Sequence, residues 1–369
     1  MKQPLVIVGP LPPPYHGVTL STALVLANPR LRISFDVRHV DTSDLRSGQN
    51  LGKWERKNVF LALRSLIHLL RQLRGPAGVV YLPLSQSTPG FVRDSLLIRI
   101  AVLRGWKVAG HLRGSDFRNF YDTSPRPLRT WTRGTLRRLT SVAVLGESLR
   151  WVFEGLVLPG RIEVVPNGTP EPDLDGAVRD ERTVLFLSNL RRRKGIVEAV
   201  EAARLVTREH DQARFLFVGE WEDESLARDL RERASVASGL IQFEDPVVGA
   251  DKDRLLASVA VVLFPPIEPE GHPRVVLEAL AAGTPVVTTD RGAIAETIVD
   301  GETGFVLPTP DPRALADRIL LLLRDADLRS RMGSAARARY LEHFTQPQAD
   351  RILAGWLSAV SEGHTEASQ

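Results

Sequence analysis

Short apolar runs alternate with longer stretches of helical periodicity along the first half of the chain. The apolar runs have the length of buried strands and occupy residues 4–9, 77–82, 106–112 and 141–146. Helical patterns fill the intervals at residues 19–27, 91–103 and 147–156. Strands that alternate with helices in this way predict a parallel sheet with helices on both faces.

A second series of the same kind occupies much of the remaining chain. Its apolar runs lie at residues 183–188, 213–219, 241–243, 259–264, 285–289 and 305–307. The segment PNGTPEPDLDGAVRDER, residues 166–182, separates the two series; it is rich in Pro, Gly and acidic residues and has no apolar period, as is typical of a linker. The pattern therefore predicts an α/β protein with two doubly wound, Rossmann-like domains, residues 1–169 and 170–345.

One more amphipathic helix ends the chain. Residues 346–362 place four large apolar side chains on one face, those of Ile352, Leu353, Trp356 and Leu357. We expect this helix to pack back on the first domain.

Composition limits the classes of protein that the chain can belong to. Its 369 residues are enough for two domains, and 43% hydrophobic with 25% charged residues is ordinary for a globular protein. No apolar run reaches the roughly 18 to 20 residues that cross a bilayer, and the start MKQPLVIVGP lacks a signal-peptide pattern. The lack of cysteine excludes disulfides and a thiol nucleophile. We therefore expect a cytoplasmic protein.

Charge is divided unevenly between the two halves. Residues 1–170 carry 24 Lys and Arg against 10 Asp and Glu, a net charge of +14, whereas the remainder carries 24 against 34, a net charge of −10. No nucleic-acid-binding module or aromatic platform accompanies the positive half, so nucleic acid is not an expected partner. An anionic membrane or an anionic acceptor fits this charge better.

The segment from Lys53 to Arg74 is a candidate for contact with such a membrane. It alternates apolar residues with Arg and Lys at helical spacing, as a helix lying on a bilayer surface does. A helix that packs on its own sheet with a solvated basic face has the same pattern. Both interpretations stay open, and the first places the protein peripherally on the inner face of the membrane.

Two carboxylates bracket the start of an apolar helix in the segment EGHPRVVLE, from Glu270 to Glu278. If all eight steps were helical, their Cα atoms would lie about 12 Å apart, at ~1.5 Å per residue. The carboxylate pair of a glycosidase lies closer, at roughly 5 to 10 Å. The spacing favours an elongated ligand held at both ends, with the positive end of the helix between them as a seat for negative charge.

Further motifs along the chain extend this pattern. They are GPLPPPYHGVT after the first strand, HLRGSDF at 111–117, VPNG at 165–168, SNLRRRKG at 188–195, FEDPV at 243–247, EGHPRVVLEALAAGTPVV from 270, and DGETGFVLP at 300–308. In order and spacing the sequence resembles the retaining nucleotide-sugar glycosyltransferases of family 4. The resemblance implies a GT-B fold, in which two Rossmann-like domains face an interdomain cleft.

The resemblance also implies the residues that bind the donor. Glu278 accepts hydrogen bonds from the ribose, and Glu270 holds hydroxyls of the donor sugar. The backbone amides of Arg274 and Val275 meet the phosphates, and Val247 contacts the base through its backbone. A helix with an acidic first turn is the simpler explanation of one glutamate, but it does not explain the second on an otherwise apolar helix.

Phosphate binding is expected in two further places. By resemblance, Gly17 faces the donor diphosphate at the start of a helix, and Lys194 contacts the same phosphates. The family often has an arginine five residues before this lysine, where this chain has Asn189. Arg191 or Arg193 are the candidates to replace it, and either is equally explained as a solvated side chain.

His111 ends a strand and completes a predicted catalytic set with Glu270 and Lys194. A structural histidine is the alternative. Arg113 and Asp116 are predicted to recognise the acceptor or to pair with each other. Tyr15 and His16 are predicted acceptor contacts beside the first glycine loop.

Metal binding is not expected. Asp-x-Asp occurs at 173/175, 251/253 and 325/327, in the linker or at helix ends where Asp is common as a cap. The resemblance implies no essential metal and no cofactor, since the nucleotide sugar is a substrate. Fixed positive charges would then stabilise the leaving group.

The sequence thus predicts a retaining glycosyltransferase that moves a sugar from a UDP- or GDP-sugar to a hydroxyl of a glycan or lipid-linked acceptor. Surface polysaccharide or lipid-linked glycan synthesis is the expected setting. No carboxylate of the motifs lies where a covalent nucleophile must be, so same-face departure and attack is the favoured mechanism. A nucleotide-sugar epimerase, a phosphorylase and a non-catalytic nucleotide-sugar-binding scaffold are the alternatives.

Overall fold

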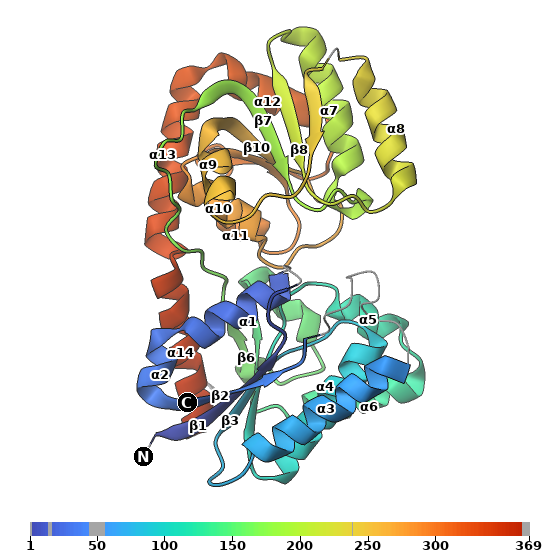
Figure 1. Cartoon of the computed structure of the whole chain (residues 1–369), viewed down its shortest axis with the longest axis vertical. Coiled ribbons are helices and arrows are strands. Elements are labelled where there is room, and N and C mark those ends of the chain that lie inside the picture. The colour runs from blue at the N-terminus through green and yellow to red at the C-terminus, as the bar shows by residue number, and fades with distance from the viewer. Residues whose placement is uncertain (1, 14–16, 44–55, 238, 364–369) are drawn as a thin grey trace. The chain divides into compact units, whose positions relative to one another are not determined.

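The computed structural model describes residues 2–13, 17–43, 56–237 and 239–363, with side chains of the helix that begins at Arg56 described from Leu63 onward. These residues form two compact units (Figure 1). The first unit combines Met1–Asn167 with Pro347–Gln369, and the second is Gly168–Gln346.

A six-stranded parallel sheet in the order β2-β1-β3-β4-β5-β6 forms the centre of the first unit. Its strands are β1 Gln3–Gly9, β2 Phe35–Asp41, β3 Val79–Pro83, β4 Lys107–His111, β5 Ser141–Val144 and β6 Ile162–Val164. The α-helices are α1 Gly17–Ala27, α2 Pro29–Ser34, α3 Arg56–Gln72, α4 Thr88–Leu103, α5 Phe117–Thr123 and α6 Arg126–Leu136. The helix predicted over 147–156 is a 3-10 helix, Glu147–Phe153, followed by a second one at Pro159–Arg161.

The second unit contains another six-stranded parallel sheet, in the order β12-β11-β10-β7-β8-β9. Its strands are β7 Asp180–Leu187, β8 Arg214–Val218, β9 Ile241–Glu244, β10 Val259–Phe264, β11 Val286–Thr289 and β12 Gly304–Leu307. Its α-helices are α7 Ile196–Glu209, α8 Glu224–Ser235, α9 Ala250–Ser258, α10 Arg274–Ala281, α11 Ile294–Thr297, α12 Pro312–Arg324 and α13 Ala326–His343. The last three residues of the predicted linker are therefore strand or strand boundary.

The strand order of each sheet predicts where a ligand would bind. In doubly wound sheets, ligands bind beyond the carboxyl ends of the strands, where the strand order reverses. That point lies between β1 and β3 in the first sheet and between β7 and β10 in the second. The loops after these four strands are therefore where a site is expected.

The last helix, α14 Gln346–Glu362, packs on the first sheet. Leu353, Trp356 and Leu357 are buried in one apolar cluster with residues of β1 and β3. The indole Nε1 of Trp356 donates to the hydroxyl of Ser141 at 2.9 Å. Nearly the whole helix thus belongs to the first unit, although it follows the second in sequence.

Helix α3 contacts the edge strand β2 and also exposes apolar side chains. Leu69 and Leu73 are buried, whereas Leu63 and Ile67 are 52% and 41% exposed. No helix of the described residues is long and apolar enough to cross a membrane. Packing on the sheet therefore explains the buried face of α3, but it does not explain the apolar side chains on the exposed face.

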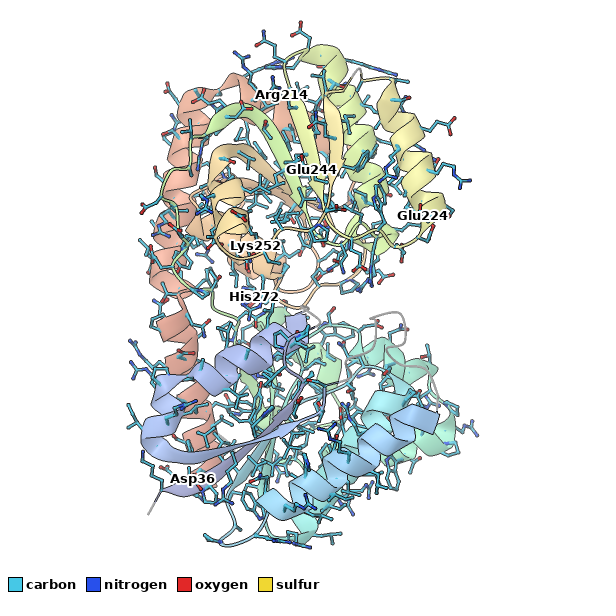
Figure 2. All side chains as sticks on the ribbon, in the orientation of Figure 1. Asp36, Arg214, Glu224, Glu244, Lys252 and His272 are labelled. Atoms are coloured by element: carbon cyan, nitrogen blue, oxygen red, sulfur yellow. The ribbon has the colours of Figure 1, made fainter. Side chains whose placement is uncertain are left out.

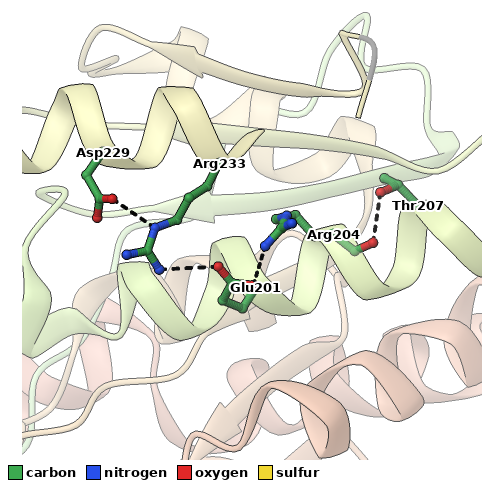
Figure 3. Close-up of polar contacts among 5 residues, drawn as sticks. All are labelled: Glu201, Arg204, Thr207, Asp229 and Arg233. Atoms are coloured by element: carbon green, nitrogen blue, oxygen red, sulfur yellow. Dashed lines mark hydrogen bonds and ion pairs between the residues drawn. The ribbon is translucent and has the colours of Figure 1, made fainter. Parts of the chain in front are cut away.

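Ion pairs link side chains of α7 and α8 in the second unit (Figure 3). The Arg233 guanidinium lies 2.9 Å from Asp229 and 3.4 Å from Glu201, and Arg204 lies 2.7 Å from the second oxygen of Glu201. The side chains of Arg233 and Asp229 are 41% and 37% exposed, whereas those of Arg204 and Glu201 are 24% and 30% exposed. Exposed pairs such as the first contribute little stability, about 1 kcal/mol or less.

Candidate active site

Two loops meet at the point where the strand order of the second sheet reverses. The loop after β7 ends in Lys194, and the loop after β10 carries Glu270. The Lys194 Nζ atom lies 2.6 Å from Glu270 Oε1, and the two side chains are only 16% and 13% exposed. A partly buried ammonium and a partly buried carboxylate are thus held against each other, as charges in such surroundings require.

Backbone hydrogen bonds join the two loops directly. The Ile267 amide donates to the carbonyl of Arg193 at 3.0 Å. Gly195 has φ = 76°, and a Cβ atom at this position would lie 1.9 Å from the carbonyl oxygen of Pro265. Glycine is therefore required for the left-handed backbone and for this close approach.

The Glu270 loop is also held from the side of β11. The hydroxyls of Thr288 and Thr289 donate to the carbonyls of Phe264 and Pro266, each at 2.6 Å. Gly292 has φ = 64°, and a Cβ atom there would lie 1.6 Å from the carbonyl oxygen of Glu270. The position of Glu270 is thus fixed by three neighbouring segments. Gly292 was not among the predicted site residues, and its only sequence signal is its place after a strand.

Helix α10 begins at Arg274, directly after Pro273. The start of a helix presents backbone amides that the helix itself does not fully use, so this helix end carries partial positive charge. Arg274 Nη1 donates to the carbonyl of Gly168 at 3.3 Å. Burial, and then the Arg274 charge, lower the pKa of His272 to about 3, so this histidine is neutral at physiological pH. His272 is labelled in Figure 2.

Glu278, the second carboxylate of the motif, is paired as well. Lys252 of α9, labelled in Figure 2, places its Nζ atom 2.7 Å from Glu278 Oε1. The side chains are 24% and 13% exposed. Lys252 was not among the predicted site residues, and its only sequence signal is its place as a basic residue in the acidic Asp-Lys-Asp start of α9. Val247, in the loop before α9, packs partly buried against the apolar core.

The two arginines that were candidates to replace the family arginine at Asn189 differ in environment. Asn189 and Arg193 are exposed, whereas Arg191 is half-buried. Its Nε atom is buried, and among the described residues it has no hydrogen-bond partner. Arg191 is therefore the better placed of the two.

In the first unit, Gly17 is the first residue of α1, and none of the described residues apart from its chain neighbours and its own helix backbone would come within 4 Å of a Cβ atom placed there. The predicted acceptor contacts Tyr15 and His16 lie outside the described residues.

His111 is fully buried at the end of β4. The Tyr81 hydroxyl lies 3.2 Å from its Nδ1 atom, and its ring makes an edge contact with Trp356 at 5.6 Å between centroids. Burial, followed by the charge of Arg113, keeps the pKa of His111 well below its usual value, although a hydrogen bond to Val165 acts in the opposite direction. The ring is therefore neutral near pH 7 and in this conformation contacts other side chains.

Arg113 follows His111 by two residues and binds two neutral oxygens. Its Nη2 atom donates to the Tyr81 hydroxyl at 2.8 Å and its Nη1 atom to Asn167 Oδ1 at 2.9 Å. Asp116 is exposed, and no ion pair joins it to Arg113 in the described part of the chain. The proposed pairing of these two residues with each other is thus not what the structure shows.

The three Asp-x-Asp pairs have structural surroundings. Asp325 caps α13 by accepting from the amide of Leu328, and Asp251 pairs with Arg254 on the same helix. Across the residues that the structure describes, no three His, Asp or Glu side chains come together as potential metal ligands.

The two doubly wound parallel sheets are those of a GT-B fold. In the second sheet, an ion-paired lysine and glutamate lie at the point where the strand order reverses. The overall fold is similar to that of HepE from Anabaena, solved in complex with UDP and glucose. The TM-score is 0.75 at 17% identity, with 97% of this chain and 100% of that chain covered. The predicted fold class is confirmed.

Residues 175–339 match the family model of glycosyl transferases group 1. The chain is 35% identical over 244 residues to phosphatidyl-myo-inositol mannosyltransferase of Mycobacterium leprae, covering 64% of this chain and 63% of the relative. It is 31% identical over 173 residues to N-acetyl-alpha-D-glucosaminyl L-malate synthase of Bacillus anthracis, covering 46% and 43%. The matches thus span less than two thirds of each relative.

Proposed function

We propose that this protein is a glycosyltransferase that transfers a sugar from a nucleotide diphosphate sugar to a hydroxyl group. The observation that carries the proposal is the Lys194–Glu270 pair at the switch point of the second sheet, 2.6 Å apart. Both groups lie at the edge where doubly wound folds bind nucleotides. The group 1 family match over residues 175–339 covers this site.

Donor binding would rearrange the ion pair. The diphosphate carries more negative charge than one carboxylate and attracts Lys194. Glu270 then becomes free to accept hydrogen bonds from hydroxyls of the sugar, which a carboxylate does with two oxygens. The amides of Arg274 and Val275 at the start of α10 supply further donors for phosphate oxygens. One ion pair in the ligand-free protein is thus replaced by two complementary contacts in the complex.

Glu278 would hold the ribose hydroxyls at the other end of the donor. Its pair with Lys252, at 2.7 Å, fixes the orientation of the carboxylate in a partly buried position. Val247, in the loop before α9, would contact the base through its backbone. Lys252 enters the proposal as a positioning residue for Glu278.

Charge develops on the leaving diphosphate as the glycosidic bond breaks. Lys194, the start of α10 and Arg191 would stabilise this charge without a metal ion. Arg191 takes the place proposed for the family arginine because it is half-buried with an unpartnered Nε atom, whereas Arg193 is exposed. Gly17, at the start of α1, is proposed as a further diphosphate contact on the basis of the family 4 resemblance.

Retention at the anomeric carbon is proposed from the family 4 resemblance. Departure and attack on the same face need no covalent nucleophile, and the leaving phosphate takes the proton of the acceptor hydroxyl. The buried and neutral His111 fits a role in fixing Tyr81 and Arg113 better than a role in proton transfer.

For the donor we propose a UDP- or GDP-hexose, because one relative is named as a mannosyltransferase and one similar structure holds UDP and glucose. For the acceptor we propose a hydroxyl of a glycan or a lipid-linked compound. Contact of α3 with an anionic membrane is part of this proposal: Leu63 and Ile67 are exposed one turn apart, next to the exposed Arg64 and Arg71.

The test is a panel of UDP-, GDP- and ADP-sugars in thermal-shift and turnover assays. A ligand that binds only the folded state raises the melting temperature. Acceptor-dependent release of the nucleoside diphosphate supports transfer. Conversion of the donor sugar without net release of the nucleoside diphosphate would favour an epimerase, and formation of a sugar 1-phosphate from a glycan and inorganic phosphate would favour a phosphorylase. Binding without turnover across many acceptors would favour a scaffold.

A further inference from the structure

Arg113 is a cation at the carboxyl edge of the first sheet that has only neutral partners. It lies in the loop directly after β4, and its side chain is half-buried. Its two hydrogen bonds go to the hydroxyl of Tyr81 and the amide oxygen of Asn167, at 2.8 and 2.9 Å. The Nε atom is buried, and no described residue accepts a hydrogen bond from it. A guanidinium has five N–H donors, so most of them are unused.

The charge of Arg113 is uncompensated within the described part of the chain, where no ion pair includes it. Another arginine of the same unit shows the contrast. Arg93 lies 2.7 Å from Asp94, a carboxylate whose side chain is only 2% exposed. Taking a guanidinium partly out of water without a counter-charge is costly. The fold accepts this cost at Arg113, which is typical of a site that a ligand's charge completes.

A buried chain of hydrogen bonds fixes the guanidinium in place. The Tyr81 hydroxyl accepts from Arg113 and also bonds to His111 Nδ1 at 3.2 Å. His111 and Tyr81 both make edge contacts with Trp356, whose indole is anchored on Ser141. Because the pKa of His111 is held well below its usual value, the ring adds no second positive charge. The cation is thus positioned before any ligand binds.

The loop that carries Arg113 is equally constrained. Gln86 lies across it and accepts from the amide of Asp116 at 2.6 Å. A Cβ atom at Gly114 would lie 2.2 Å from Gln86 Nε2, so glycine leaves the space that this side chain occupies. A rigid loop loses little conformational entropy when it binds a ligand.

We propose that Arg113 binds an anionic group, a phosphate or a carboxylate, on the acceptor substrate. A planar guanidinium with unused donors matches the two oxygens of either group. The net charge of +14 on residues 1–170 would attract such acceptors from solution. The assignment of the anion to an acceptor substrate rests on the proposed function. The anion site itself consists of residues of the first unit alone. The anion is supplied either by a lipid headgroup or by a soluble compound.

The first experiment is calorimetric titration of the full chain with inorganic phosphate. A Lys194→Ala background removes the donor-side ammonium. Into it we introduce Arg113→Gln, Arg113→Lys, and the matched control Arg104→Gln, which deletes an exposed charge of the same unit. We expect about tenfold weaker phosphate binding, or more, in Arg113→Gln, because a charge-assisted bond is lost. Arg113→Lys should be intermediate, and Arg104→Gln should equal its parent.

Equal phosphate affinity with and without Arg113→Gln overturns the proposal, provided that melting shows both proteins folded. If Arg113→Gln does not fold, the phosphate affinity of Arg113→Lys is compared with that of its parent instead. Equal affinity of the two proteins would contradict a bidentate contact from Arg113. Binding of nucleotide sugars is measured separately in chains that retain Lys194. If Lys194→Ala leaves that binding intact, the proposed function fails while the phosphate result at Arg113 stands by itself.

A second experiment separates the two sources of the anion. Phosphatidylcholine vesicles with and without phosphatidylglycerol are sedimented with the parent, Arg113→Gln and Arg104→Gln. Glycerol phosphate is titrated in parallel. Sedimentation that falls in Arg113→Gln alone supports a lipid headgroup, and loss of glycerol phosphate binding in that variant alone supports a soluble anion. If Arg113→Gln changes neither, no anionic acceptor group binds there.

Discussion

The carboxyl edges of the two sheets handle charge in different ways. At the edge of the second sheet, Lys194 and Lys252 are each paired with a glutamate at 2.6 and 2.7 Å. At the edge of the first sheet, Arg113 is held by a tyrosine hydroxyl and an asparagine oxygen. At the second edge the lysine charges are already balanced by glutamates, so an anionic ligand has to displace a glutamate from its lysine. At the first edge, Arg113 can bind an anion without breaking an ion pair.

This difference has a physical consequence for binding. Breaking a partly buried ion pair costs energy that the ligand must replace, so binding at the second edge favours a highly charged group such as a diphosphate. An unpaired guanidinium can accept a single weaker anion.

Lys194→Ala should have the largest effect at the second edge. Removing one preorganised cation from a developing charge typically lowers turnover by about 10²- to 10³-fold. Steady-state turnover with the identified donor measures this loss, and the acceptor KM should change little. The control is Arg313→Ala, an exposed member of a surface ion pair on α12. An unchanged turnover in Lys194→Ala would remove this residue from the mechanism.

Gly292→Ala should displace the backbone of Glu270. The left-handed conformation alone costs about 1 to 3 kcal/mol for a residue with a side chain, and the carbonyl of Glu270 lies in the way of the new Cβ atom. Gly301→Ala is the matched control, since Gly301 has φ = 76° but open space around it. We expect both variants to lose stability in urea unfolding and only Gly292→Ala to lose donor affinity. Equal donor affinity in the two would show that Gly292 does not position Glu270.

The pH dependence of stability should reveal the buried histidine of the second unit. The folded-state pKa of His272 is about 3, so as pH falls below about 6.5 the unfolded chain binds this proton first. Its contribution is complete above pH 6.5 and is lost between pH 6.5 and 3 at about 1.4 kcal/mol per pH unit. Between pH 7.5 and 5.0, the free energy of unfolding of the parent should therefore fall by about 2 kcal/mol more than that of His272→Gln. Parallel pH profiles would contradict the buried neutral state.

Lys252→Met should weaken donor binding by about tenfold, because Glu278 loses the charge that orients it. Calorimetry with the donor measures this. Arg254→Ala is the matched control on the same helix, where an exposed arginine pairs with Asp251 and Asp173. If both variants bind the donor alike, the Lys252–Glu278 pair has no part in binding.

Arg233→Ala should have the smallest effect. Its pairs with Asp229 and Glu201 are exposed (Figure 3), and we expect a loss of about 1 kcal/mol or less in unfolding free energy with no change in turnover. A larger loss would mean that the surface pairs resemble the pairs at the carboxyl edge, and the contrast with Lys194 would weaken.

Much of the fold follows from local sequence. The buried central strands are continuous apolar runs, such as Val259–Phe264, and such runs identify themselves. The edge strand Phe35–Asp41 was missed because only Phe35 and Val40 are buried and most residues between them are polar. The short strand Ile162–Val164 was missed because three residues form no detectable period.

The sequence by itself determined the two parallel sheets, the resemblance to family 4 and the presence of Lys194, Glu270 and Glu278, because apolar period and motif spacing are local properties. Only the tertiary structure decided which residues contact these charged side chains and hold them in position. Lys252 reaches Glu278 from another helix, Gly292 makes room for Glu270, and Tyr81 and Asn167 hold Arg113. These partners are 22 or more residues apart in sequence, and no local pattern encodes a contact that forms only when separate strands and helices pack together.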